Sequence, residues 1–255
     1  MSLEVLLSTM NLNILDLDKM NIKVPCIVIN QCGKVGYREY KNFKIYDTNE
    51  IGVAKSRNMA ISKSTADILL FADNDCVYKD NFDKAITDFY DKYKDADMVF
   101  FNLKIYDNYL KKDNKIKKIH WYNYQKYGAC RISFKKKNIK LNNYFGGNSL
   151  YSHGEDTLFI KDYLKSNMKV YASNECIGKI TNDFDSTWFK GYTDKFFFDK
   201  GALFCALSPK FKHLQCIQYL IRHKKIRNKG FFKTLSIMFK GVKDYEKNIS
   251  NNTNI

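Results

Sequence analysis

Short apolar runs alternate with amphipathic stretches along the first hundred residues. The runs at 4–9, 26–30 and 67–72 are rich in Leu, Ile and Val, and polar residues bound each of them. Continuous runs of this length are typical of parallel strands that are buried on both faces. A fourth run, at 97–103, has the same character. The pattern therefore predicts four strands of one sheet.

Helical periodicity fills two of the gaps between these runs. Val53 and Ala60 lie seven residues apart and share one face of a helix. After the third run, Asp80 or Asn81 can cap a second helix. Its apolar residues follow at helical spacing: Phe82, Ala85, Ile86, Phe89, Tyr90 and Tyr93. Strands that alternate with helices predict an α/β fold, with a mostly parallel sheet and helices on both of its faces.

Two carboxylates stand where the third predicted strand ends. Asp73 and Asp75 follow the run at 67–72 and are separated by Asn74. In an extended chain, residues i and i+2 point the same way, and ligands of open α/β sheets bind at the carboxyl ends of the strands. Oxygen ligands of this kind suit Mg²⁺ or Mn²⁺. The alternative is an Asx-type turn before the next helix, and these three residues alone do not decide between the two.

Length and cysteine content limit the class of protein. A chain of 255 residues with 45% hydrophobic content can bury the core of one main domain. Its seven cysteines form no CxxC pair, which indicates neither a zinc site nor a disulfide framework. The N-terminus lacks the basic region of a signal peptide, and no apolar run approaches the length of a membrane span. We therefore expect a cytoplasmic protein.

The net charge of +16 predicts an anionic partner, because such a field attracts polyanions. Lysine and arginine are dense at 210–247, where Asp244 and Glu246 are the only acidic residues, and a second basic stretch at 111–118 is typical of a loop or hairpin tip. Part of the first stretch forms an apolar stripe at helical spacing: Phe231, Phe232, Leu235, Met238, Phe239 and Val242. A basic amphipathic helix of this kind lies on an anionic membrane or packs on the main domain, and both interpretations stay open.

Two sequence stretches carry a resemblance to a known family. NEIGVAKSRNMAISKSTADILLFADNDC, at 49–76, resembles the central motif of family 2 of the GT-A glycosyltransferases, in which Asn-x-Gly, Arg-Asn on a helix and a strand ending in Asp-x-Asp follow at this spacing. GEDTLFIKDYLKSNMKVYAS, at 154–173, is similar to the Glu-Asp motif at a helix start in the same family. The resemblance spans residues 3–175, and 185–203 resembles the more variable region beyond. It implies a GT-A fold and an enzyme that uses a nucleotide-sugar donor.

The resemblance also implies roles for individual residues on the donor side. Asp73 would contact the donor ribose or the metal, with Asn74 beside it, and Asp75 would bind the Mn²⁺ or Mg²⁺ that bridges the donor diphosphate. Further donor-side positions are Thr9, Asn11, Asn30, Gln31 and Arg57. For Arg57, a core-facing or salt-bridging role is the alternative.

Glycosyl transfer also requires a second acidic site. A base takes the proton of the acceptor hydroxyl as this oxygen attacks the anomeric carbon, while a cation on the opposite side accepts the departing diphosphate. The resemblance makes Asp156 this base, beside Glu155, and helix capping is the alternative for the pair. A single displacement inverts the anomeric configuration. Because the Gln-x-x-Arg-Trp motif of processive synthases is absent, we expect one sugar per encounter.

Three positions depart from the family pattern or extend it. The family often places an Asp after the second strand to read the base, but this chain has Asn30 and Gln31 there, so recognition of uridine is an expectation only. Cys76 stands where a further Asp is common and is expected to be a packing residue. The segment 144–156 is expected to be a mobile acceptor-side loop, because Gly146 and Gly147 permit unusual backbone angles.

The expected organisation is a catalytic domain at 1–205, a basic helical extension at 206–248 and a polar tail at 249–255. Within the catalytic domain, the donor half ends near residue 103 and the acceptor half follows. The expected acceptor is a glycan or a lipid-linked saccharide in cell-surface polysaccharide assembly. The enzyme would act in the cytoplasm, with the basic helices on an anionic surface at the inner face of the cell membrane.

Two other functions compete with this interpretation. A nucleotidyltransferase that makes the activated sugar would release pyrophosphate, but the Gly-rich, Arg-containing loop expected near its N-terminus is missing. A nucleic-acid-binding protein would explain the charge and the many aromatic residues. It would leave both acidic motifs unexplained, and we expect no nucleic-acid partner.

Overall fold

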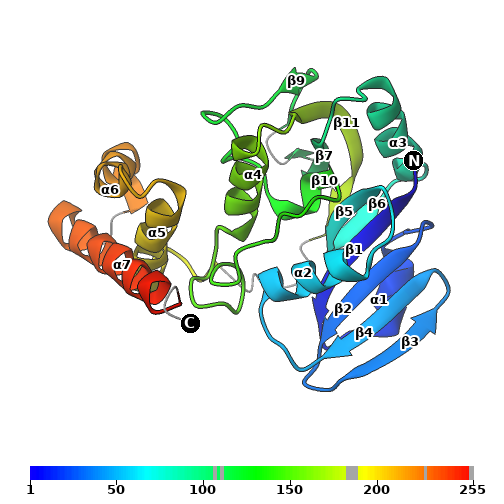
Figure 1. Ribbon diagram of the computed structural model, residues 1–255, viewed down its shortest axis with the longest axis horizontal. Coiled ribbons are helices and arrows are strands. Elements are labelled where there is room, and N and C mark those ends of the chain that lie inside the picture. The colour runs from blue at the N-terminus through cyan, green and yellow to red at the C-terminus, as the bar shows by residue number, and fades with distance from the viewer. Residues whose placement is uncertain (106–107, 110–111, 182–188, 227–228, 253–255) are drawn as a thin grey trace.

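The computed structural model shows an α/β body with three C-terminal helices beside it (Figure 1). It describes the chain except for residues 106–107, 110–111, 182–188, 227–228 and 253–255, and the side chains of Asn108, Tyr109 and Asn252. Parts of the expected variable region and of the expected tail therefore lie outside the described residues.

One sheet forms the centre of the body. Its strands are β1 (Leu3–Met10), β2 (Cys26–Gln31), β3 (Gly36–Tyr40), β4 (Phe43–Thr48), β5 (Ile68–Asp73), β6 (Cys76–Tyr78), β7 (Met98–Ile105), β10 (Ile132–Lys135) and β11 (Val170–Ile180). Their order is β3-β4-β2-β1-β5-β10-β7-β11-β6, and two short strands, β8 (Asn108–Tyr109) and β9 (Lys117–Lys118), pair with β7 and β11. The run from β4 to β5 is parallel, as is the pair of β7 and β11, whereas β3, β10 and β6 are antiparallel to their neighbours. The predicted mostly parallel sheet is confirmed, with antiparallel insertions.

The four predicted strands are confirmed as β1, β2, β5 and β7, and each is buried on both faces over most of its length. In β1, Leu6 belongs to the hydrophobic core on one face of the sheet, while Val5 and Leu7 belong to the core on the other. Side chains alternate across a strand, so a strand between two cores needs a continuous apolar run.

Helices cover both faces of the sheet, as the alternating pattern predicts. On one face lie α2 (Val53–Lys63) and α4 (Glu155–Lys165), and on the other lie α1 (Ile14–Lys19) and α3 (Phe82–Lys92). Two 3₁₀ helices, Ala129–Arg131 and Lys224–Ile226, complete the short elements. The helices predicted around residue 57 and after residue 81 are therefore confirmed.

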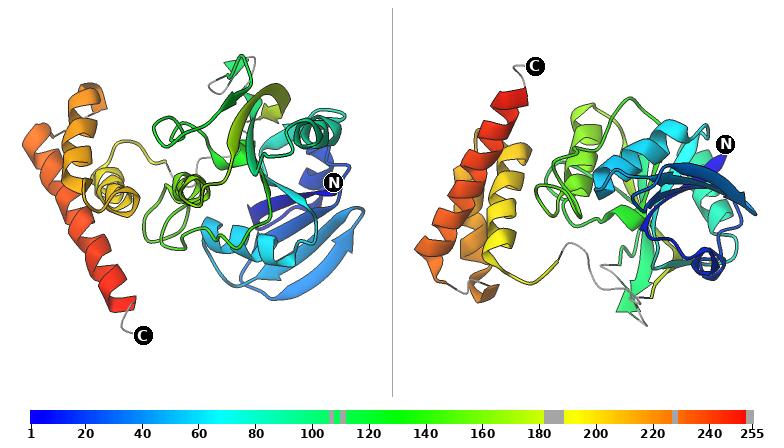
Figure 2. Two further views of the ribbon diagram at one scale, coloured as in Figure 1. Left: turned by 45° about the horizontal axis from the view of Figure 1, so that its top comes forward. Right: turned by 90° about the horizontal axis from the view of Figure 1, so that it is seen from below.

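The C-terminal helices are α5 (Asp194–Leu207), α6 (Lys212–Arg222) and α7 (Phe231–Asn252). Both views in Figure 2 place α5 between α4 and α7. The helices α5 and α7 are closely packed, because a Cβ added at Gly201 would overlap the backbone of Met238. The expected domain boundary at residue 205 falls inside α5, and α7 continues into the stretch expected as a tail.

The apolar stripe of α7 packs inward. Met238 and Val242 are fully buried in the core that α5 and α6 share, whereas Phe232 is 82% exposed. The sequence left open whether this stripe lies on a membrane or packs on the protein. The structure shows that most of the stripe packs on α5 and α6. None of the described helices is both long and apolar enough to cross a membrane.

Candidate active site

The parallel strands end together at one edge of the sheet. The register places Thr9 beside Asn30 and Asn30 beside Asp47, and Asp73 ends the neighbouring β5. The Asn30 amide donates to Asp47 Oδ1 at 2.6 Å, and Asn30 Oδ1 accepts from the Leu12 amide at 2.9 Å. The ends of β1, β2, β4 and β5 therefore form one polar edge, where ligands of such sheets bind.

The other expected donor-side residues line or flank this edge. Gln31 is buried, and its Oε1 accepts from the Gly52 amide at 2.7 Å, which fixes the end of β2 to the start of α2. Asn11 is exposed just after β1 and has a φ of 49°, a left-handed conformation that Asn tolerates better than most residues. Thr9 is buried and Asn74 is half-buried. Thr9 and Gln31 are thus buried at the polar edge, whereas Asn11 and Asn74 lie at its more exposed margin.

Arg57 connects this edge with the second acidic motif. Its Nη2 donates to Asp73 Oδ1 at 2.8 Å, and its Nη1 donates to Glu155 Oε1 at 2.9 Å, 98 residues further along the chain. The guanidinium group is 4% exposed and lies over the Phe71 ring, 5.3 Å from the ring centroid. Burial alone would lower the pKa of Arg57, but Asp73 and Glu155 together raise it above its ordinary value, so the cation is permanent. For Arg57 the sequence left open a salt-bridging role beside donor contact, and the structure shows two salt bridges.

Glu155 and Asp156 are adjacent at the start of α4, as the sequence predicts. Burial raises the pKa of Glu155 to about 7, and the charge of Asp156 acts in the same direction while Arg57 opposes it. Burial also raises the pKa of Asp156, against the opposing effects of Arg57 and of the Thr157 amide, which donates to Asp156 Oδ1 at 2.6 Å. A carboxylate pair that titrates closer to neutrality than usual can accept a proton during a reaction, as a general base must.

Residues from three other segments surround this pair. Lys200 of α5 faces Asp156: burial lowers the pKa of Lys200 to about 8, and the nearby carboxylate of Asp156 opposes that shift. A Cβ added at Gly128 would lie 3.8 Å from Asp156 Oδ2. At Gly146, where φ is 108°, an added Cβ would lie 3.0 Å from Glu155 Cδ. Sequence reasoning missed Lys200 and Gly128, because neither belongs to a motif, and it gave Gly146 only a place in a loop.

Asp73 is the last residue of β5, whereas Asn74 and Asp75 form the turn to β6, so the extended geometry expected for the two carboxylates ends at Asp73. Asp73 is 38% exposed, and Asp75 is half-buried with its backbone oxygen accepting from the Thr181 amide at 2.9 Å. No group of three His, Cys, Asp or Glu side chains suited to a metal exists among the described residues. Mg²⁺ and Mn²⁺ are commonly held by one or two carboxylates plus phosphate oxygens of a substrate, so the pair meets that requirement. Cys76, the next residue, is fully buried, as expected of a packing residue.

Comparisons with known proteins identify the family and the fold of the chain. Residues 33–167, more than half of the 255-residue chain, match the sequence model of glycosyl transferase family 2. The structure is similar to that of S. aureus TarS 1–349 in complex with UDP-GlcNAc, with a TM-score of 0.66 and 16% identity over 96% of this chain and 80% of that one. It is also similar to a structure of S. aureus TarS of which this chain covers 48%, with a TM-score of 0.62, 15% identity and 96% of this chain covered. No curated protein matches the chain.

The family match includes the α2 motif, the strand that ends at Asp73 and the pair at the start of α4. The similarity to TarS extends over nearly the whole chain and confirms the expected GT-A fold. The chain therefore belongs to glycosyl transferase family 2 and is a glycosyltransferase.

Proposed function

We propose that the enzyme transfers one sugar from a uridine diphosphate sugar to a hydroxyl group of a glycan or lipid-linked saccharide, with inversion at the anomeric carbon. The observation that carries this proposal is the double ion pair of Arg57. One guanidinium group contacts both Asp73, at the end of β5, and Glu155, beside Asp156. The carboxylates suited to a metal and the carboxylates suited to proton transfer therefore lie on two sides of one side chain.

The donor would lie along the polar edge formed by β1, β2 and β5. Asp75 and Asp73 would hold Mn²⁺ or Mg²⁺, which neutralises the charge that develops on the departing diphosphate. Thr9, Asn30 and Gln31 would contact the nucleoside. That TarS was crystallised with UDP-GlcNAc supports uridine as the base.

Asp156 would take the proton of the acceptor hydroxyl. Its Oδ1 accepts the Thr157 amide hydrogen, which holds the carboxylate at the start of α4. Glu155 is held by Arg57 and keeps a second buried carboxylate beside Asp156, which favours proton uptake by the pair. The attacking oxygen would approach from the acceptor side, formed by Gly128 and the loop around Gly146.

The proposal includes a cytoplasmic location and contact with an anionic membrane surface through α6 and α7. Lysine and arginine are concentrated at 222–229, where α6 ends and before α7 begins, and α6 and its N-terminal turn expose Phe211, Leu214 and Ile221. Exposed apolar residues among basic ones are typical of helices that lie at a membrane interface. The acceptor would then be part of a cell-surface polysaccharide under assembly.

Calorimetric binding of nucleoside diphosphates, with and without Mn²⁺, tests the donor site. We expect UDP to bind in the presence of the metal and Asp75→Ala to abolish this binding. Asp88→Ala, which removes an exposed carboxylate from α3, should leave it unchanged. Binding that needs no metal, or that survives Asp75→Ala, would refute the metal site.

Product analysis tests the reaction. We expect release of UDP from the donor, whereas a nucleotidyltransferase would form pyrophosphate. Asp156→Asn should lower kcat by about 10²–10⁴-fold while UDP binding persists, because only proton transfer is removed. An unchanged kcat would exclude Asp156 as the base.

A further inference from the structure

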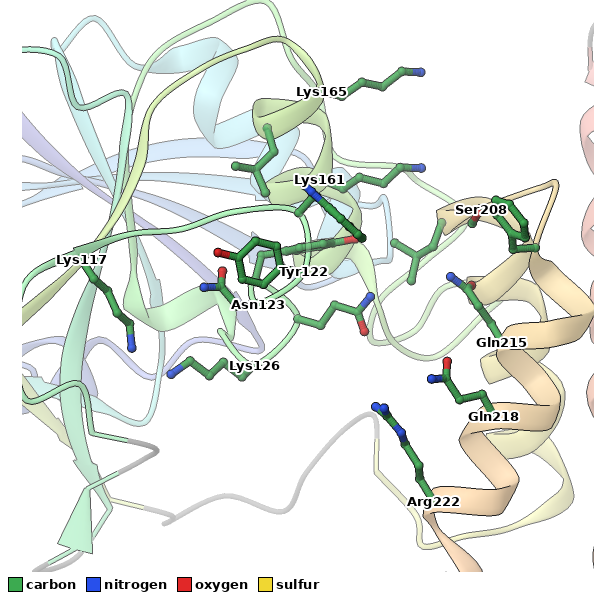
Figure 3. A pocket seen from close by; sticks show the side chains of 16 residues that line it. Lys117, Tyr122, Asn123, Lys126, Lys161, Lys165, Ser208, Gln215, Gln218 and Arg222 are labelled. Carbon is green, nitrogen blue, oxygen red and sulfur yellow. The ribbon is translucent and has the colours of Figure 1, made fainter.

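A pocket of about 1230 Å³ lies between the α/β body and the C-terminal helices. One wall consists of residues 117–126 and the second half of α4, and the opposite wall consists of the end of α5 and one side of α6. In Figure 3, Lys117 and Lys126 extend from the first wall, while Gln215, Gln218 and Arg222 extend from α6 toward it. None of the expected donor-side or catalytic residues lines this pocket.

The pocket carries a strong positive charge. Its lining includes Lys117, Lys126, Lys161, Lys165 and Arg222, and none of the described residues that line it is acidic. Cations on both walls can bind one anion from two sides. These cations lie at a concave surface, where low-dielectric walls strengthen the local potential.

Nearby acidic residues neutralise only part of this charge: Asp113 pairs with Lys117 and Lys126, and Asp162 of α4 interacts with Lys161 and Lys165. The buried carboxylate of Asp113 accepts from Lys117 at 2.7 Å, from Lys126 at 3.1 Å and from Arg131 at 3.2 Å. One carboxylate thus faces three cations. Lys161 also donates to the backbone oxygen of Ala206 at 2.9 Å, which orients its ammonium group.

Aromatic and amide side chains make the pocket suitable for a saccharide rather than for a simple ion. Trp121 is 79% exposed and Tyr122 is 68% exposed, and their rings are perpendicular with centroids 5.7 Å apart. Exposed ring faces offer an apolar platform to the C–H face of a sugar ring. Opposite them, the side chains of Gln215 and Gln218 line the other wall, and side-chain amides of this kind can exchange hydrogen bonds with sugar hydroxyl groups.

Three segments of the chain run from the pocket to the proposed active site. A Cβ added at Gly128, two residues after the pocket-lining Lys126, would lie 3.8 Å from Asp156 Oδ2. Along α4, Lys161 follows Asp156 by five residues, a rise of about 8 Å. On α5, Lys200 faces Asp156 and the pocket-lining Leu207 follows two turns later. A chain bound in the pocket could therefore present its end to Asp156.

We infer that this pocket binds an anionic glycan chain, namely the part of the acceptor that precedes the hydroxyl group to be glycosylated. The inference rests on the proposed transferase function and adds the substrate class: a saccharide chain with repeated negative charge. Phosphodiester and uronate groups share the required chemistry, because lysine and arginine bind both. The aromatic pair would contact the sugar rings, and the basic side chains on the two walls would contact the anionic groups.

Direct binding measurements test the inference without the sugar donor. Three probes of equal length are compared by calorimetry: a phosphodiester-linked sugar oligomer, a uronic acid oligosaccharide and a neutral oligosaccharide. The pocket variant is Lys165→Gln with Arg222→Gln, which changes exposed residues on opposite walls. The control variant, Lys44→Gln with Lys84→Gln, removes the same charge from exposed positions on β4 and α3.

We expect at least one anionic probe to bind wild type at least tenfold more tightly than the neutral probe. The pocket variant should weaken this binding about tenfold, and the control variant less than twofold. Trp121→Ala should weaken it further, whereas Trp121→Phe should retain most of it. The stronger of the two anionic probes identifies phosphate or carboxylate as the preferred group.

Three results would overturn the inference. They are equal binding of the neutral probe, equal losses in the pocket and control variants, and tighter binding of single-stranded RNA or anionic lipid vesicles that the pocket variant abolishes. UDP binding with Mn²⁺ is measured in parallel on each variant. Intact UDP binding with lost glycan binding supports the pocket, whereas a wild type that binds anionic glycans but no nucleotide would refute only the proposed transfer reaction.

Discussion

Replacing Glu155 by Gln is expected to stabilise the protein at alkaline pH. The Glu155 side chain is 12% exposed, and burial raises its pKa from 4.5 to about 7 despite the ion pair with Arg57. Between these two values, the folded protein keeps a proton that the unfolded chain has released. Stability therefore falls as the pH rises through this window, because the unfolded state binds fewer protons.

The magnitude follows from the same two pKa values. A difference of about 2.5 pH units corresponds to about 3 kcal/mol, since each unit is worth about 1.4 kcal/mol. Gln has nearly the shape of protonated Glu and cannot ionise, so Glu155→Gln avoids this loss. The variant should match wild type near pH 4.5 and exceed its free energy of unfolding by about 3 kcal/mol at pH 8.

Urea unfolding at pH 4.5, 6 and 8 measures this difference. Glu175→Gln, at an exposed position, serves as the control and should follow wild type at every pH. If Glu155→Gln is less stable than wild type at pH 8, the attraction of Arg57 outweighs the cost of burial and the reasoning is wrong. A gain in stability would show that the site keeps a destabilising charge for its chemistry, a known trade-off in enzymes.

Two further predictions concern the ion pair and the C-terminal helices. Arg57→Met should lower the free energy of unfolding by about 3–5 kcal/mol at pH 8, because it leaves buried carboxylate charge without its cation. The loss should shrink at pH 5, where Glu155 takes up a proton, and urea unfolding at both pH values measures it. Gly201→Ala should destabilise by about 1–3 kcal/mol, since the new methyl group overlaps the backbone of Met238. At an exposed helical position, replacing Gly by Ala would instead stabilise the protein by about 1 kcal/mol. A lower midpoint of thermal unfolding therefore indicates close packing of α5 on α7, and a higher midpoint would contradict it.

The sequence predicts those parts of the fold in which local pattern and environment agree. The strands β1, β2 and β5 lie between two cores and so require continuous apolar runs, which are visible in the sequence. The hairpin of β3 and β4 was not predicted, because β3 is GYREY, a short and mostly polar edge strand. The strand β10 has only four residues and is defined by its two neighbours in the sheet rather than by its own sequence.

In the candidate site, too, local sequence pattern predicts some residues and not others. The positions of Asp73 and Asp75 follow from the end of a strand, and that of Glu155 from the start of a helix, so local reasoning is sufficient for them. The contact between Arg57 and Glu155 joins residues 98 positions apart, and no periodic pattern encodes that separation. Lys200 lies in a helix that is buried around much of its circumference, so its sequence neighbours do not indicate which side faces Asp156.

The position of β10 affects how the nascent chain can fold on the ribosome. Only the short β6 and α3 separate β5 from β7 along the chain, yet β10 lies between them in the sheet and is antiparallel to both. The two main partners of β7, namely β10 and β11, are both synthesised after it. Until residue 135 has emerged, β5 and β7 keep open edges, which are the surfaces through which chains aggregate. The first 105 residues therefore contain the whole polar edge formed by β1, β2, β4 and β5 but cannot complete their sheet, which needs β10 and β11.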